Sequence, residues 1–199
     1  MRTLFFSGMR EGQLLGSQWG DIDWQHNVVD LRRTIAFRKG RLIVSTPKSG
    51  KLRTVEVPAS LIGRLRELRS IRQAEAALGS TDPEPWVFPA ATDRRKPLND
   101  AWFRDRVRRP LLEKAEVRHI RVHDARHTYA SLMLRRGVPP TYVSRQLGHS
   151  SIQVTVDLYG HFMPGADRHH VDGLADAIEA AGRAPDAAPT VNTAEDQRA

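Results

Sequence analysis

The chain has 199 residues, which is enough for one domain with its own hydrophobic core and too few for two ordinary domains joined by a linker. Its 31 Lys and Arg residues outnumber 23 Asp and Glu residues, and the net charge of +8 favours a polyanionic partner such as nucleic acid. The lack of cysteine excludes disulfides and thiolate zinc sites, and no apolar run reaches the length of a membrane span, so we expect a soluble cytoplasmic protein that binds no membrane.

The first half of the chain is expected to hold a helix, a small sheet and a second helix. Ser7 can cap a helix that ends near Gly20. Three segments rich in β-branched and aromatic residues are separated by glycine-containing turn signals, which predicts an antiparallel meander of residues 28–37, 42–46 and 54–57. Leucines at helical spacing after Pro58 predict an amphipathic helix that ends before Gly79.

The second half is expected to be helical. Apolar periodicity and Gly or Pro punctuation predict helices over residues 98–116, 124–136, 140–147 and 151–160. Val171, Leu174 and Ile178 share one stripe of a further amphipathic helix at 167–181. Residues 183–199 are too polar to bury a core and are expected to be disordered. The fold class is therefore α+β and mainly helical.

Five short motifs follow one another in an order that is more informative than any one of them. They are Gly8-Met9-Arg10, Thr46-Pro47-Lys48-Ser49-Gly50, His123-Asp124-Ala125-Arg126, Leu147-Gly148-His149 and Tyr159-Gly160-His161. Together they resemble the signature of the tyrosine recombinases, the phage integrase family, from about residue 3 to about residue 165. The resemblance implies an integrase-type catalytic domain over residues 1–165 with a small three-stranded antiparallel sheet.

The same resemblance implies site-specific recombination or integration of DNA through a 3′-phosphotyrosyl intermediate. It makes Tyr159 the nucleophile and Lys48 the acid that protonates the leaving 5′-oxygen. Lys51 is the rival for the role of Lys48, because an alignment across a loop can slip. The remaining site residues implied by the family are Arg10, His123, Arg126 and His149.

The residue types fit phosphoryl chemistry. A phosphodiester repels nucleophiles, so catalysis must neutralise its non-bridging oxygens, and two guanidinium groups can do this in place of a metal ion. We therefore expect no metal and no cofactor. His123 and Arg126 are three residues apart on one helix and can face a single phosphate, whereas His127 is expected to pack. Gln13 stands where the family usually has an acid, which would weaken the orientation of Arg10 or His149.

Two alternatives come from other classes of protein. A non-catalytic, DNA-binding remnant of an integrase would use residues 124–136 and 140–147 as a helix-turn-helix. A metal site would use His123 and His127, although no third ligand is evident in the sequence. Type IB topoisomerases share the tyrosine chemistry, but the strands around Lys48 favour a bacterial or phage recombinase.

The expected partners are double-stranded DNA and further recombinase protomers. Basic residues number twelve between positions 32 and 72 and thirteen between 94 and 136, so the positive charge lies in the folded part. Family members place a helical core-binding domain before the catalytic domain, and we expect that domain to be absent from this chain. The helix within residues 166–182 is expected to contact other protomers on DNA.

Overall fold

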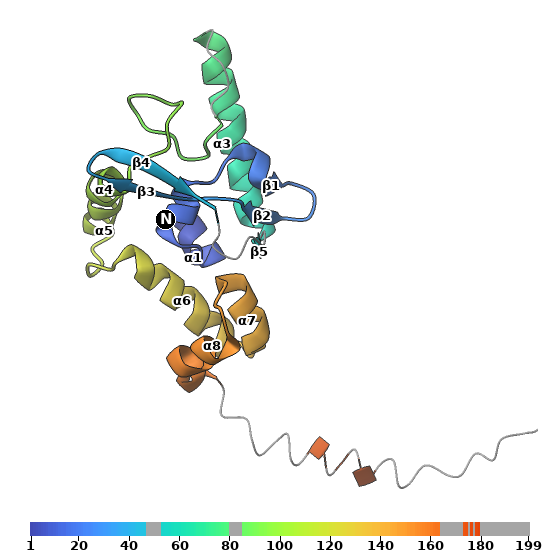
Figure 1. Cartoon of the computed structure of the whole chain (residues 1–199). Coiled ribbons are helices and arrows are strands. Elements are labelled where there is room, and N and C mark those ends of the chain that lie inside the picture. The colour runs from blue at the N-terminus through green and yellow to red at the C-terminus, as the bar shows by residue number, and fades with distance from the viewer. Residues whose placement is uncertain (47–52, 80–84, 164–172, 175, 177, 180–199) are drawn as a thin grey trace, which may run out of the picture. The chain divides into compact units, whose positions relative to one another are not determined.

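The computed structural model describes residues 1–46, 53–79, 85–163, and residues 173, 174, 176, 178 and 179 (Figure 1). The chain divides into two units, residues 1–163 and 164–199. Lys48, Lys51, Val171 and the tail at 183–199 lie outside the described residues.

Two short helices open the chain, whereas the sequence predicts one helix starting at Ser7. The first, α1, spans Arg2–Ser7, and the second, α2, spans Glu11–Leu15. Ser7 therefore ends a helix, and its hydroxyl donates to the carbonyl of Thr3 instead of capping a new helix. The break follows from Gly8, which has φ of 62° and so takes the left-handed conformation that ends α1.

The strands form two separate antiparallel sheets, so the prediction of one meander is wrong in its pairing. Strands β1 (Ile22–Asp23), β2 (Val28–Leu31) and β5 (Arg53–Glu56) form a sheet in the order β1-β2-β5. Strands β3 (Thr34–Arg38) and β4 (Arg41–Ser45) form a hairpin of their own. Val29 lies opposite Val55, so β2 pairs with a strand far along the chain.

The separation of β2 from β3 has a local cause at two arginines. Arg32 and Arg33 stand between the strands, and the Arg33 guanidinium binds the carboxylate of the buried Asp21 and the carbonyl of Gly16. Because a buried carboxylate needs such a partner, the backbone turns toward it and the strand ends.

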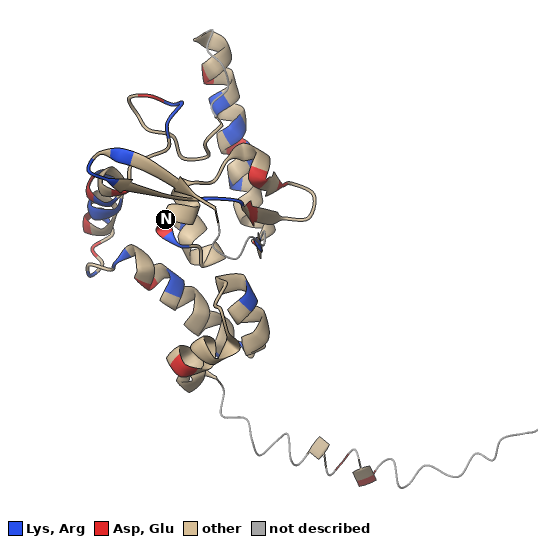
Figure 2. Cartoon of the chain, in the orientation of Figure 1, with Lys and Arg blue, Asp and Glu red and all other residues tan. Residues whose placement is uncertain are grey.

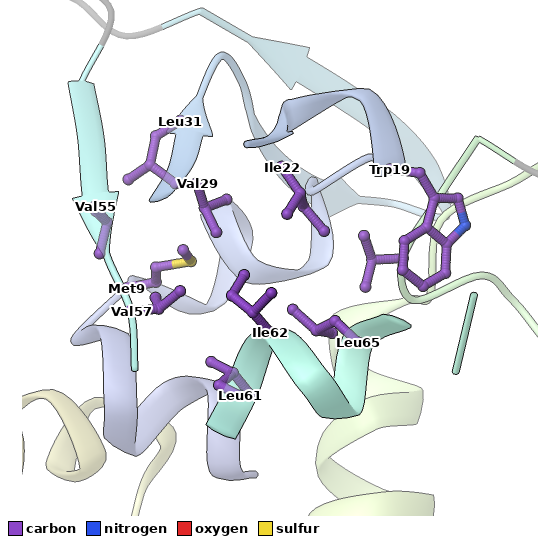
Figure 3. Close-up of a cluster of buried hydrophobic side chains, with 11 residues drawn as sticks. Met9, Trp19, Ile22, Val29, Leu31, Val55, Val57, Leu61, Ile62 and Leu65 are labelled. Atoms are coloured by element: carbon purple, nitrogen blue, oxygen red, sulfur yellow. The ribbon is translucent and has the colours of Figure 1, made fainter. Parts of the chain in front are cut away.

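The first core cluster lies between the three-stranded sheet and α3, which spans Ala59–Leu78 as predicted (Figure 3). Ile62 and Leu65 of α3 share this cluster with Val29 and Val55 of the sheet and with Met9 of the loop before α2. Met9 is 2% exposed, so the residue beside Arg10 is anchored in this core.

The second core cluster joins α1, α2 and β3 to a helical segment in the second half of the chain. This segment is continuous from residue 100 to 114, with α4 (Asp100–Trp102), a π-helical stretch η2 (Phe103–Arg108) and α5 (Arg109–Lys114). Leu4, Leu14 and Leu15 are each at most 2% exposed and share this cluster with Phe103.

Three helices that the sequence predicts form the third cluster. They are α6 (Val122–Arg135), α7 (Pro140–Leu147) and α8 (Ile152–Tyr159), followed by the short 3-10 helix η3 (Gly160–Phe162). Tyr129, Leu147 and Tyr159 are buried together among them. In the second unit, the described residues between 173 and 179 are helical, and Leu174 and Ile178 are exposed.

Candidate active site

Arg126 joins three of the five sequence motifs. Its guanidinium lies in the interior, 2% exposed, and donates from Nη1 to the carbonyl of Gly8 at 2.8 Å and from Nη2 to the carbonyl of Leu147 at 2.7 Å. Gly8 belongs to the segment that carries Arg10, and Leu147 belongs to the segment that carries His149. Helix α6 therefore holds both other segments around its own arginine.

Three arginines create a concentrated positive field at this junction. Burial lowers the pKa of Arg126 to about 9, and the charges of Arg10 and Arg53 act in the same direction. Burial, followed by the charge of Arg10, lowers the pKa of Arg53 to about 10. Arg10 itself is exposed. Guanidinium groups gathered in this way favour an anion that can accept their remaining hydrogen bonds.

Arg53 is a member of this site that the sequence motifs do not include. It is the first residue of β5, and its Nη2 donates to Oε1 of Gln13 at 3.1 Å. Its Nη1 is buried without a hydrogen-bond partner among the described residues. A signal was available in the sequence, because Arg53 follows Lys48 by five residues and directly precedes the strand predicted over residues 54–57.

Gln13 supports the site through its amide oxygen. The same Oε1 that accepts from Arg53 also accepts from the backbone N–H of Arg10 at 3.1 Å. This second bond fixes the first turn of α2, where Arg10 is the residue before the helix. An amide thus makes both contacts that a carboxylate would make here, and it leaves the positive charge of the arginines uncompensated.

His149 is held in its neutral form. It lies in the loop after α7, and its Nδ1 is 2.8 Å from the hydroxyl of Thr155. Burial, and then the charges of Arg126, Arg10 and Arg53, lower the pKa of His149 to about 4. Thr155 is completely buried and is likewise absent from the sequence motifs. With Nδ1 engaged, Nε2 is the ring nitrogen that remains for a ligand.

Tyr159 ends α8 between two histidine rings. Its ring stacks on that of His149 with centroids 6.4 Å apart and lies 5.6 Å from that of His127. The Tyr159 hydroxyl is 2.7 Å from Nδ1 of His127, so His127, which is expected from the sequence to pack, also contacts the phenol oxygen. The tyrosine is 3% exposed, and burial raises the pKa of the phenol while Arg126 opposes that shift.

His123 lies one helical turn before His127, and their rings meet edge to face at 4.8 Å. Burial lowers the pKa of His123, and His127, Arg126 and Arg10 lower it further. The structure thus brings together Arg10, His123, Arg126, His149 and Tyr159, while Lys48 lies outside the described residues.

Other features of the described chain bear on the alternatives. The hydroxyl of Tyr142 donates to Oε2 of Glu56 at 2.9 Å. Within the described residues, no three His, Cys, Asp or Glu side chains are grouped as a metal site would require. None of the helices in that part of the chain is both long and apolar enough to cross a membrane.

Comparisons with known proteins agree with one another. The model of the phage integrase family matches residues 1–164. The chain is similar to a "Tyrosine recombinase XerC-like" protein of Caldanaerobacter subterraneus, with 36% identity over 188 residues, which are 86% of this chain and 47% of that protein. It is also similar to the ICEBs1 integrase of Bacillus subtilis, with 26% identity over 87% of this chain and 47% of that protein.

A solved structure with the same fold is that of the Tn1549 transposon integrase in complex with transposon right end DNA. Its TM-score is 0.68 at 18% identity, covering 87% of this chain and 57% of that chain. The chain spans about half the length of the curated relatives it matches.

Proposed function

This chain belongs to the phage integrase family, and from that premise we propose that it cuts and rejoins double-stranded DNA through a covalent bond between Tyr159 and a 3′-phosphate. One observation carries the proposal. Arg126 ties the segments of Arg10 and His149 together beside the hydroxyl-bearing ring of Tyr159. A cluster of cations next to a phenol is the arrangement that a phosphodiester and its nucleophile require.

The charged groups act on the phosphate. Arg10 and Arg126 neutralise the non-bridging oxygens as phosphorus becomes pentacoordinate, and Arg53 adds to their field. His149 donates from Nε2 in the neutral tautomer in which the Thr155 hydroxyl donates to Nδ1, since the neutral ring carries a single N–H. His123, on the same helix as Arg126, supplies a further hydrogen bond to the phosphate.

The covalent step exchanges one phosphate ester for another. The Tyr159 oxygen forms a bond to phosphorus as the bond from phosphorus to the 5′-oxygen breaks. Lys48, assigned by the sequence motif alone, protonates that leaving oxygen. Because the phosphotyrosyl ester retains the energy of the phosphodiester, a second 5′-hydroxyl can attack it and rejoin the strand without ATP.

The test is capture of the protein on DNA. Short nicked duplexes of randomised sequence, incubated with the chain without added metal, should yield a protein–DNA adduct that survives denaturant. Tyr159→Phe should abolish the adduct and retain binding, while the matched control Tyr142→Phe, which loses its bond to Glu56, should form it. Binding without any adduct in the unaltered chain would favour the non-catalytic DNA-binding alternative.

The distribution of Lys and Arg residues supports binding of duplex DNA by residues 1–165, the proposed catalytic domain. Lys and Arg residues lie along α3, on the α4–α5 segment and on α6 and α7 (Figure 2). A surface that contacts phosphates binds more weakly as salt increases and carries little sequence information. We therefore expect salt-sensitive DNA binding with little sequence preference for this chain.

The helix within residues 166–182 is proposed to contact a neighbouring protomer on DNA. Leu174 and Ile178 are four residues apart on a helix and are 60% and 63% exposed, so this apolar stripe needs a partner. Deleting residues 166–199 should abolish assembly of several protomers on one duplex. Unchanged assembly combined with lower stability of the monomer would show that the helix folds back on its own chain.

A further inference from the structure

We propose that His127 accepts the phenolic proton of Tyr159 during attack on the phosphate. The proposal rests on the function proposed above and assigns a group that the five motifs leave out. It starts from one contact, the 2.7 Å between the Tyr159 hydroxyl and Nδ1 of His127.

The hydroxyl needs such a partner because of its surroundings. A phenol must lose its proton before or during attack, and Tyr159 is only 3% exposed, so bulk water has little access to it. Burial opposes ionisation of the phenol. His127 is partly exposed and can therefore pass the proton on to solvent.

The neighbouring groups fit the role less well. His149 stacks parallel to the tyrosine ring and has its Nδ1 engaged by Thr155, so it lies against the face of the ring. A guanidinium cannot accept a proton, which excludes Arg126. His127 is therefore the group in hydrogen-bond contact with the oxygen that reacts.

Several titratable groups surround His127 and influence its protonation and its tautomer. His123 faces it edge to face from the preceding turn of α6, and Asp124 interacts with it electrostatically from the same helix. Tyr159 faces it from α8, and Arg126 acts on that tyrosine. To accept a proton at Nδ1, His127 must be the neutral tautomer with its hydrogen on Nε2.

The step balances in both directions. In cleavage the O–H bond of Tyr159 breaks, the proton moves to Nδ1 of His127, and the tyrosine oxygen bonds to phosphorus as the bond to the 5′-oxygen breaks. In rejoining, a 5′-hydroxyl attacks phosphorus and gives its proton to the amine that Lys48 became when it protonated the leaving oxygen. The bond from phosphorus to the tyrosine oxygen breaks, and the imidazolium of His127 returns its proton to that oxygen.

A substrate with an activated leaving group isolates this step. In short duplexes of randomised sequence that carry a 5′-bridging phosphorothiolate, the departing thiolate needs no proton, so the contribution of an acid such as Lys48 is bypassed. His127→Ala and His127→Gln should both slow adduct formation by about 10²-fold or more, since glutamine accepts a hydrogen bond but takes no proton. His26→Ala, at an exposed histidine paired with Asp23, should react at the unaltered rate.

The pH profile separates proton transfer from positioning. The rate of both variants should rise more steeply with increasing pH than the rate of the unaltered chain, because without the imidazole the phenolic proton must pass to water or hydroxide. A His127→Gln variant with the unaltered rate and profile would overturn the assignment while adduct formation still supported the proposed function. A complete lack of adduct in the unaltered chain would overturn both proposals.

The free protein offers a test that needs no DNA. Nitrogen NMR of the folded chain at neutral pH should show His127 with its hydrogen on Nε2, and its substitution should shift the Tyr159 Cζ resonance. A hydrogen found on Nδ1 would make His127 the donor to the tyrosine oxygen, which contradicts the proposal about His127 alone.

Discussion

Arg53 and Gly148 occupy adjoining space so closely that a Cβ atom at position 148 would overlap the Arg53 guanidinium. Gly148 also has φ of 64°, which residues other than glycine adopt at a cost. Two structural features therefore favour glycine at position 148 of the Leu-Gly-His motif. They are the backbone conformation of that residue and the arginine beside it.

We first predict that Gly148→Ala lowers the free energy of unfolding by about 1–3 kcal/mol. Gly137→Ala is the matched control, because Gly137 has φ of 76° and a methyl group added there would meet no atom within 4 Å. Urea denaturation should show a larger loss at position 148 than at 137. If Arg53→Ala does not reduce the loss caused by Gly148→Ala, the overlap is not its source.

A second prediction concerns the partly unsatisfied charge of Arg53. Arg53→Met should slow adduct formation without lowering stability, because it removes a desolvated cation whose Nη1 has no partner in the described chain. Single-turnover rates and urea denaturation measure the two effects. Arg64→Met, at an exposed arginine paired with Glu67, should change neither quantity.

Arg10 and Arg126 should respond differently to removal. Arg10→Ala should slow adduct formation by about 10²-fold with little change in stability, because Arg10 is exposed. Arg126→Ala should in addition destabilise the fold by about 1–3 kcal/mol for each buried carbonyl that loses its bond. If Arg10→Ala lowers the rate and the DNA affinity by equal factors, Arg10 contributes to DNA binding and not to the chemical step.

Thr155 should act through His149. Thr155→Val removes the hydroxyl next to Nδ1, frees the ring to change tautomer and should slow adduct formation by about 10-fold. Thr128→Val, which loses a bond to the Asp124 carbonyl, is the control. The slower rate should be accompanied by a change in the nitrogen NMR spectrum of His149. An unchanged spectrum would show that the slower rate comes from altered packing and not from a change of tautomer.

Stability should fall in mild acid because of His149. Its folded-state pKa is lowered to about 4 while an unfolded histidine titrates near 6.5, so the unfolded chain binds more protons between these values. The free energy of unfolding should therefore decrease as pH falls from about 6.5 toward about 4. His149→Gln should flatten this part of the curve, and an equal slope in both chains would refute the shifted pKa.

The sequence predicts most of the elements and only part of their pairing. Local periodicity identifies α3 and the helices α6, α7 and α8, because each buries a face whose spacing is visible in the chain. It cannot predict that β5 pairs with β2, since this depends on Arg33 turning to a buried Asp21 and ending β2. The predicted first helix is misplaced because Ser7 suits a cap in sequence, whereas Gly8 ends a helix there.

The candidate site shows the same limit. Arg10, His123, Arg126, His149 and Tyr159 follow from motifs, and the structure brings them together. The proposed role of His127 is not visible in the sequence. The sequence shows only where His127 lies on helix α6, and not which side chains of other helices it contacts. Its partner hydroxyl comes from α8, thirty-two residues later, and such a contact has no local signature. Thr155 escapes prediction for the same reason, whereas the position of Arg53 shortly after Lys48 offered a signal in the sequence.

The two buried hydrogen bonds of Arg126 also predict which substitutions would accumulate in copies of this gene that no longer recombine DNA. A copy released from selection for recombination, but still selected to fold, would keep Arg126 because Gly8 and Leu147 depend on it. The exposed Arg10 has no such protection. In a collection of degenerate integrase genes, an intact arginine at position 126 would therefore indicate that the fold survives. Under the proposed function, an intact arginine at position 10 would indicate that the activity survives.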